Sequence, residues 1–141
     1  MQRKFLVTGG TGFLGANLVK RLLKNGYQVR VLDNESRGQK GRLAEEMDQV
    51  EIVTGDIRDP RVVEQAAKGC QSVIHMAYIN GTEFFYSKPE LVLEVGVKGM
   101  LNVLDACRSQ EIGDLVLISS SEVYQTPPSI PAPEDVPLVI P

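Results

Sequence analysis

Short apolar stretches alternate with longer stretches of helical periodicity along most of the chain. The apolar stretches are strand-sized and rich in Val, Ile and Leu, and they predict strands at 4–7, 28–32, 50–53, 72–75 and 114–119. Between them, the spacing of apolar residues predicts helices at 12–25, 40–47, 60–68 and 89–110. Pro60 and Pro89 suit a first helical turn, and Gly26 and Gly69 suit the left-handed position just past a helix end.

This alternation of strands and helices predicts an α/β fold, in which helices cover both faces of a parallel sheet. Right-handed crossovers then lead to a Rossmann-type doubly wound sheet of about five strands in the order 3-2-1-4-5. We expect residues 1–125 to form this one domain, because 141 residues are too few for two. Six of the eight prolines lie in residues 125–141, so 126–141 is expected to be an extended segment that leads to an absent remainder.

Composition and charge exclude several classes of function. The chain is 43% hydrophobic and 23% charged, which are ordinary values for a globular protein. Its net charge is −3, so it lacks the basic excess of proteins that bind nucleic acid or anionic membranes. No apolar run approaches the roughly 18 residues of a membrane span, and no signal-peptide core is visible. The single histidine and the two cysteines, which lack zinc-like spacing, predict no metal site. The cysteines are expected to be small buried or half-buried thiols in a reducing, cytoplasmic compartment.

A glycine-rich turn, TGGTGFLG (residues 8–15), follows the first predicted strand. It contains the G-x-G-x-x-G spacing of a dinucleotide-binding turn. An early glycine permits the tight turn, Gly12 lets a pyrophosphate approach the backbone, and Gly15 lets the helix pack closely on the strand. The first N–H groups of the helix then face the phosphates. Any tight strand–helix turn can have such glycines, but the position after the first strand favours a dinucleotide.

Acidic residues follow the second and third predicted strands. Asp33 lies 21 residues after Gly12, the spacing at which a carboxylate accepts hydrogen bonds from an adenosine ribose, although it could simply begin a turn with Asn34. A carboxylate there repels a 2′-phosphate and favours NAD over NADP, while Arg37 is close enough in sequence to pair with such a phosphate. Asp56 could accept from the adenine amino group or could be a turn or N-cap residue.

Polar side chains also follow the fourth and fifth predicted strands. His75 ends the fourth strand, where a lone histidine is more often a packed, hydrogen-bonded residue than an acid or base. The fifth strand runs into SSSEVY (residues 119–124). Polar residues at the carboxyl end of a parallel strand face the ligand crevice, so these hydroxyls and Glu122 are placed to meet a substrate. The alternative is an ordinary serine-rich turn.

Together these motifs resemble the extended short-chain dehydrogenase/reductase family, and within it the NAD-dependent nucleotide-sugar epimerases and dehydratases. The likeness covers essentially the whole chain and is carried by TGGTGFLG, Asp33-Asn34, Gly55-Asp56-Ile57, His75-Met76-Ala77 and SSSEVY. It implies that residues 1–125 bind NAD and that a substrate domain lies outside this sequence. The cofactor-binding residues that it implies are Gly9, Gly12, Phe13, Leu14, Gly15, Asp33, Asn34, Asp56, Ile57, Met76, Ala77 and Ser119.

The resemblance also implies a reaction. In the family a tyrosine takes the proton of a sugar hydroxyl, hydride passes to NAD, and the keto-sugar is epimerised, dehydrated or decarboxylated before hydride returns. Ser120 matches the residue that hydrogen-bonds the reacting hydroxyl, Glu122 matches the glutamate of dehydratase- and decarboxylase-type members, and Tyr124 matches a structural tyrosine. The catalytic tyrosine belongs to a Tyr-x-x-x-Lys pair, and none of the four tyrosines here has a lysine four residues later. We therefore expect NAD binding without turnover.

Two positions depart from the family pattern. Tyr78 stands where a second alanine usually follows His-x-Ala, and Gly96 stands where an asparagine is expected in the long helix. Both changes bear on the shape of the cofactor pocket and on its water structure.

The leading hypothesis is an enzyme of the isomerase or lyase class that acts on a UDP-, dTDP- or GDP-linked sugar. A non-catalytic nucleotide-binding module is the second, and an NADPH-dependent reductase, which the charge of Asp33 disfavours, is the third. Members of the family commonly dimerise through the long helix and the next one, so the resemblance also implies a homodimer through the helix at 89–110, with weak association expected of this chain. On that helix, spacing predicts that one face toward the sheet is formed by Leu91, Val95, Leu101 and Leu104. Further apolar surface comes from Val92, Val97, Met100 and Val103.

Overall fold

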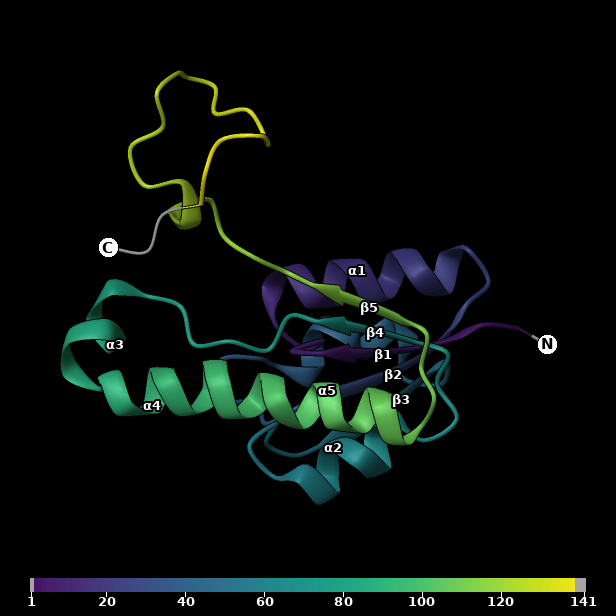
Figure 1. Cartoon of the computed structure of the whole chain (residues 1–141). Coiled ribbons are helices and arrows are strands. Elements are labelled where there is room, and N and C mark those ends of the chain that lie inside the picture. Colours follow the sequence, from purple (N-terminus) through teal and green to yellow (C-terminus); the bar gives the residue numbers. More distant parts are fainter. Residues whose placement is uncertain (1, 139–141) are drawn as a thin grey trace.

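The computed structural model describes residues 2–138 and contains one parallel sheet with helices on both faces (Figure 1). Its five strands are β1 (Lys4–Thr8), β2 (Gln28–Asp33), β3 (Val50–Thr54), β4 (Ser72–His75) and β5 (Asp114–Leu117). They lie in the order β3-β2-β1-β4-β5, and every pairing is parallel. The expected Rossmann-type sheet is confirmed.

Alternate residues of the strands anchor helices on opposite faces of the sheet. Leu6 of β1 packs in a cluster with α2 (Pro60–Ala67) and α5 (Gly99–Ser109), whereas Val7 packs in a second cluster with α1 (Phe13–Lys24). The reason is the strand period of two, which sends successive side chains to opposite faces. Figure 1 accordingly shows α1 on one side of the sheet and α2 with α5 on the other.

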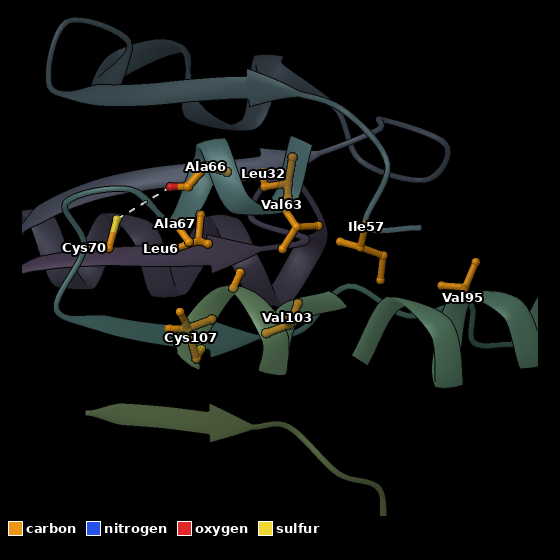
Figure 2. Close-up of a cluster of buried hydrophobic side chains, with 12 residues drawn as sticks. Leu6, Leu32, Ile57, Val63, Ala66, Ala67, Cys70, Val95, Val103 and Cys107 are labelled. Atoms are coloured by element: carbon orange, nitrogen blue, oxygen red, sulfur yellow. Dashed lines mark hydrogen bonds between the residues drawn. The ribbon is translucent and has the colours of Figure 1, made fainter. Parts of the chain in front are cut away.

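The cluster under α2 and α5 is drawn in Figure 2, and several of its side chains are completely buried. It includes Cys70 and Cys107, which are free thiols, as expected from the sequence. Burial raises the pKa of both thiols above the ordinary value, so they behave as small apolar side chains.

Several element boundaries differ from those that the sequence predicted. The strand expected at 114–119 ends at Leu117, and the helix expected at 40–47 is a 3₁₀ helix, η1 (Lys40–Glu46). A short helix, α3 (Thr82–Ser87), was not predicted. None of its residues is buried, so it has no amphipathic periodicity to reveal it. Gly26 and Gly69 have φ values of 81° and 75°, which confirms their left-handed positions after helix ends.

The long helix consists of α4 (Pro89–Leu93), a π-helical turn η2 (Glu94–Lys98) and α5. The predicted inner face was wrong in part, because Leu101 and Leu104 are exposed. The residues that are buried are Val92, Val95, Gly99, Val103, Ala106 and Cys107. Val95 was predicted on this face, whereas Val92 and Val103 were predicted as additional apolar surface and are buried instead. Gly99 and Ala106, whose small size lets the helix pack closely, were not predicted. A Cβ at Gly99 would lie 2.4 Å from Cδ1 of Ile57.

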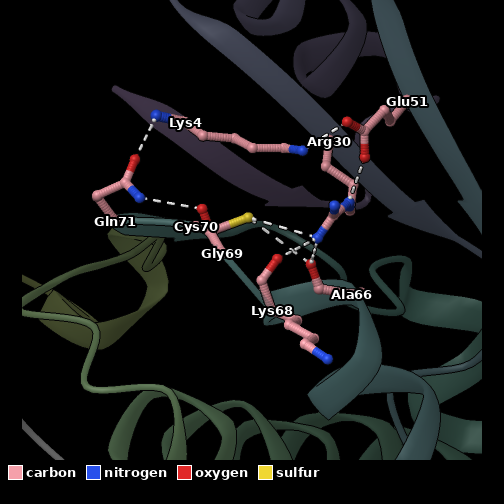
Figure 3. A network of polar contacts seen from close by, with 8 residues as sticks. All are labelled: Lys4, Arg30, Glu51, Ala66, Lys68, Gly69, Cys70 and Gln71. Carbon is pink, nitrogen blue, oxygen red and sulfur yellow. Dashed lines mark hydrogen bonds and ion pairs between the residues drawn. The ribbon is translucent and has the colours of Figure 1, made fainter. Parts of the chain in front are cut away.

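A polar network holds α2 at the amino edge of the sheet (Figure 3). Arg30 donates to the carbonyls of Ala66 and Lys68 at the end of α2, each at 2.7 Å, and to the carboxylate of Glu51. Hydrogen bonds from Lys4 and Arg30 lower the pKa of Glu51. Arg30 thus satisfies carbonyls that a helix end leaves without partners.

The proline-rich segment contains no helix or strand within its described part, residues 126–138. That agrees with the irregular backbone expected there, and the remaining residues of the expected segment, 139–141, lie outside the described part. The division of the chain at residue 125 stays a prediction. Within residues 2–138, no helix combines the length and the apolar character needed to cross a membrane.

Candidate functional site

The glycine-rich turn joins β1 to α1 at the carboxyl edge of the sheet. Gly9 has a φ of +73°, a value that few residues other than glycine adopt, and its N–H donates to the carbonyl of Leu32 at 2.8 Å. A Cβ on Gly15 would lie 2.2 Å from the carbonyl oxygen of Gly9, so α1 begins in direct contact with the turn. These are the tight turn and the close packing that the sequence predicted for an early glycine and for Gly15.

The start of α1 is open to an anion. Gly12 is the N-cap residue and provides no side-chain cap, so the N–H groups of the first turn remain available. A Cβ on Gly12 would lie only 3.1 Å from the carbonyl oxygen of Gly9. Phe13 and Leu14, which are 73% and 66% exposed, flank this backbone. The geometry fits a pyrophosphate held by main-chain N–H groups.

Asp33 ends β2 directly beside this turn. Its Oδ2 accepts a hydrogen bond from the N–H of Thr11 at 3.0 Å, and its Oδ1 accepts from the N–H of Glu35 at 2.8 Å. Gly38 of the following loop lies over the carboxylate, since a Cβ there would be 3.0 and 3.1 Å from the two oxygens. Asp33 therefore begins a turn and also places a buried negative charge beside the glycine-rich turn. Its contact with a ribose stays a prediction.

Arg37 has other partners than a phosphate in this structure. Its guanidinium donates to the carbonyl of Asn80 and lies 6.0 Å from the centre of the Phe84 ring. The contact joins the loop after β2 to the loop after β4. Because its charge is already engaged, Arg37 gives weak support to NADP binding.

Asp56 is held in a turn by Arg58. Arg58 donates to its carboxylate from the main-chain N–H, from Nε and from Nη2, at 2.8–3.0 Å, and Asn34 donates to it at 3.1 Å. These bonds, chiefly the side-chain bonds of Arg58, lower the pKa of Asp56 to about 2. The N-cap of α2 is Asp59, so of the two structural alternatives for Asp56 the turn is observed. Contact with adenine stays a prediction for Asp56 and for its neighbour Ile57, which is buried.

Arg58 and Thr8 were not singled out by the sequence. Arg58 also donates to Glu94 at 2.9 Å and so links the loop after β3 to the long helix. The Thr8 hydroxyl accepts from the N–H groups of Met76 and Ala77, both at 3.1 Å. It joins the glycine-rich turn to the end of β4. No local sequence pattern shows such contacts, because the partners are 36 to 69 residues apart.

His75 is a packed residue, as the sequence suggested. It is 4% exposed, and its Nδ1 lies 2.7 Å from the Thr8 hydroxyl. Because that hydroxyl already accepts two N–H groups, its proton is free to donate to Nδ1. Burial lowers the pKa of His75 to about 4, so the ring is neutral near neutral pH.

Thr11 contains a buried polar atom without a partner. The residue is fully buried, and its Oγ1 has no hydrogen bond. It lies in the glycine-rich turn, and a Cβ on Gly38 would overlap it at 1.9 Å. Buried hydroxyls normally have a partner, and this one is instead covered by Gly38 of the following loop.

The residues after β5 are far less enclosed. Ser119, Ser120 and Glu122 are exposed, and the Ser120 hydroxyl accepts from the N–H of Glu122 at 3.3 Å as the N-cap of a 3₁₀ turn, η3 (Ser121–Tyr124). The hydrogen bond from Ile118 N–H to the carbonyl of His75, at 3.1 Å, ties the start of this segment to β4. Catalytic roles for Ser120 and Glu122, and cofactor contact for Ser119, stay predictions. Among residues 2–138 no group of three or more His, Cys, Asp or Glu residues is arranged to hold a metal ion.

Comparison with known proteins gives consistent matches. The model of the NAD dependent epimerase/dehydratase family matches residues 5–140. A UDP-glucose 4-epimerase of Neisseria meningitidis serogroup B is 33% identical over 141 residues, which cover 96% of this chain and 42% of the relative. A dTDP-4-dehydro-6-deoxy-D-allose reductase of Streptomyces bikiniensis is 30% identical over 138 residues, covering 94% of this chain and 42% of the relative.

Solved structures agree with these matches. The UDP-glucose 4-epimerase of Bifidobacterium longum, in complex with NAD⁺ and UDP, superposes with a TM-score of 0.89 at 28% identity and covers 96% of this chain. This chain matches 42% of that one. It therefore spans about two fifths of the length of the proteins that it resembles.

Proposed function

The chain belongs to the NAD-dependent epimerase/dehydratase family, and on this basis we propose that it is the NAD-binding part of a nucleotide-sugar epimerase or dehydratase. The observation that carries the proposal is the glycine-rich turn with the Asp33 carboxylate beside it. The N–H groups of the first turn of α1 suit the pyrophosphate, and Asp33 suits the two hydroxyls of the adenosine ribose. The lack of room for a Cβ at Gly15, which brings the start of α1 against the turn, fits a site built around such a ligand.

The adenosine half of NAD would lie over β2, next to Asp33, Asn34, Asp56 and Ile57. Thr11 and Glu35 already donate to Asp33, and each carboxylate oxygen can accept one further hydrogen bond from a ribose hydroxyl. The negative charge and the engagement of Arg37 both favour NAD over NADP. We assign Met76 and Ala77, which Thr8 holds against the turn, to the pyrophosphate and nicotinamide side.

The substrate would be a UDP-, dTDP- or GDP-linked sugar, with its reacting hydroxyl near Ser120. When bound, NAD accepts and later returns a hydride at the sugar carbon. The Ser120 hydroxyl would orient the reacting hydroxyl, and Glu122 would exchange a proton with the sugar in a dehydratase- or decarboxylase-type reaction. No tyrosine of this sequence is paired with a lysine four residues later, so this chain lacks a group suited to remove the hydroxyl proton. We expect it to bind NAD without turnover.

Calorimetry with NAD and NADP tests the cofactor site. Asp33→Ala removes two charged acceptors and should weaken NAD binding by on the order of 1–3 kcal/mol, while NADP binding changes little or improves. Asp48→Ala, which removes an exposed acid elsewhere, is the matched control. Equal losses for the two cofactors would show that Asp33 is only a turn residue.

Glu122→Gln separates the two types of chemistry. In a form of the protein that also contains a Tyr-x-x-x-Lys pair, the change should slow product formation by roughly 10²–10⁴ while reduced cofactor accumulates, because glutamine cannot exchange a proton. Wild-type product formation in that variant would leave simple epimerisation, which needs no glutamate here, as the supported activity.

A homodimer through the long helix is also proposed. Its outer surface has an apolar stripe composed of Leu93, Val97, Leu101 and Leu104, which are 43–64% exposed. A second copy of this helix would bury the stripe. Sedimentation at increasing concentration should show association that Leu101→Glu abolishes and that Tyr86→Glu, at an exposed residue of α3, preserves. The two buried free thiols fit a reducing compartment such as the cytoplasm.

A further inference from the structure

Tyr78 and Gly96, the two positions that depart from the family pattern, are in contact with each other. A Cβ on Gly96 would lie 2.8 Å from Cε2 of the Tyr78 ring and 3.7 Å from Cδ2 and Cζ. Carbon atoms do not approach to 2.8 Å without displacement, so the ring occupies the space that a side chain at position 96 would need. A large residue in one place is thus matched by the absence of a side chain in the other.

The ring stands at the carboxyl edge of the sheet. Tyr78 comes three residues after β4 and directly after Ala77, whose main-chain nitrogen would be 2.9 Å from a Cβ on Gly9. Ala77 therefore adjoins the glycine-rich turn, and Tyr78 is the next residue along the chain. Tyr78 is 51% exposed although its ring packs on the helix. Exposure of a large aromatic surface beside a proposed ligand site gives that ligand a surface to cover.

The position of Asp33 indicates which part of the ligand meets the ring. A dinucleotide lies across the point where strand order reverses, here between β1 and β4. Asp33 lies on β2, so the adenosine is on that side and the pyrophosphate is at the glycine-rich turn. The nicotinamide riboside half must then extend over β4, toward Tyr78.

We propose that the Tyr78 ring is a wall of the cofactor site that contacts the nicotinamide riboside half of NAD, and that Gly96 is required for the ring to lie there. This inference rests on the proposed binding of NAD. Gly96 lies in the π-helical turn η2, where the missing side chain leaves the helix surface flat under the ring. The pair acts as one unit, in which a side chain at 96 displaces Tyr78.

The test compares NAD with ADP, which has the adenosine and pyrophosphate but no nicotinamide riboside. Calorimetry on the full 141-residue chain should give a Kd for NAD that is roughly threefold to tenfold higher in Tyr78→Ala, with the Kd for ADP unchanged. Tyr78→Phe keeps the ring and should bind NAD as the wild type does. Tyr86→Ala removes a tyrosine that is 85% exposed on α3 and should change neither Kd.

A double-mutant cycle tests the pairing. Gly96→Ala should raise the Kd for NAD in the wild-type background, because it displaces the ring, and should have no further effect in Tyr78→Ala. Alanine favours a helix more than glycine does, so Gly96→Ala should also raise the Tm more in the Tyr78→Ala background than in the wild type. Additive effects in both measurements would overturn the pairing.

The outcomes separate this inference from the proposed function. If the wild type binds both NAD and ADP but Tyr78→Ala binds NAD equally well, the ring is no part of the cofactor site and the inference is overturned. An equal loss of ADP affinity in Tyr78→Ala would also overturn it, since the effect would not be local to the nicotinamide half. If the wild type binds neither ligand, the proposed function itself is wrong and the wall has no ligand.

Discussion

The turn after β1 and the turn after β5 both lie at the carboxyl edge of the same sheet, yet they are built differently. The first turn is fixed by a main-chain hydrogen bond to β2 and by a hydrogen bond to the Asp33 carboxylate. In addition, α1 packs so closely on it that position 15 has no room for a methyl group. In the second, Ser119, Ser120 and Glu122 are exposed, and the Ser120 hydroxyl makes a local bond. A ligand of the first turn meets prearranged groups, whereas a ligand of the second must order them.

The largest expected effect tests the packing of the first turn, with a glycine at the amino end of β5 as the control. Gly15→Ala puts a Cβ 2.2 Å from a main-chain oxygen, which cannot move aside as a side chain would, and should cost about 3 kcal/mol of unfolding free energy. Gly113→Ala, just before β5, has nothing within 4 Å of its Cβ and should change stability by less than about 0.5 kcal/mol. Denaturant unfolding measures both. Equal stability of the two variants would show that the first turn is not rigid.

The next effect concerns pH and the junction of β1 with β4. The folded pKa of His75, about 4, lies below the ordinary value near 6.5, so the unfolded chain binds a proton first as pH falls. The free energy of unfolding should therefore show no loss from His75 above pH 6.5, and it should decline by up to about 3 kcal/mol as the pH falls to 4. His75 is the single histidine, so His75→Gln, in protein without an added histidine tag, should remove this slope. Persistence of the slope in that variant would assign it to other groups.

A matched change of carboxylate to amide compares the two turns directly. Asp33→Asn weakens a buried acceptor of two main-chain N–H groups and should lower the free energy of unfolding by about 1–3 kcal/mol. Glu122→Gln changes an exposed side chain and should alter it by less than about 0.5 kcal/mol. Thermal and denaturant unfolding of the two variants give the comparison. If Glu122→Gln were the more costly, the second turn would be held by contacts of Glu122.

The smallest effect concerns another turn, the one after β3 that contains Asp56. Its pKa, about 2, is below the ordinary value, so its pairing with Arg58 contributes stability above about pH 4 that is lost as pH falls toward 2. The ion pair is partly exposed, and solvent screening reduces its contribution to stability. Arg58→Gln should therefore lower the free energy of unfolding by about 1 kcal/mol or less near neutral pH. The cost should fall toward zero near pH 2. A cost that does not change with pH would mean that Arg58 contributes by packing.

The sequence alone determined the type and order of the strands, because an alternation of strand-sized apolar runs with helical periods permits few right-handed arrangements. It also located the glycine-rich turn and Asp33, whose roles depend on short spacings along the chain. It did not reveal that Leu101 and Leu104 face outward, since the small residues Gly99 and Ala106 take part in the buried stripe in their place. It did not predict α3, which has no buried side.

Only the tertiary structure decided contacts between distant residues. The Thr8 hydroxyl meets Met76 and Ala77, Arg58 meets Glu94, and Tyr78 lies on Gly96, although each pair is separated by 18 or more residues. Such contacts depend on which strands become neighbours and how closely a helix approaches them. Local spacing contains neither quantity, because packing distance is set by the sum of side chains from several elements.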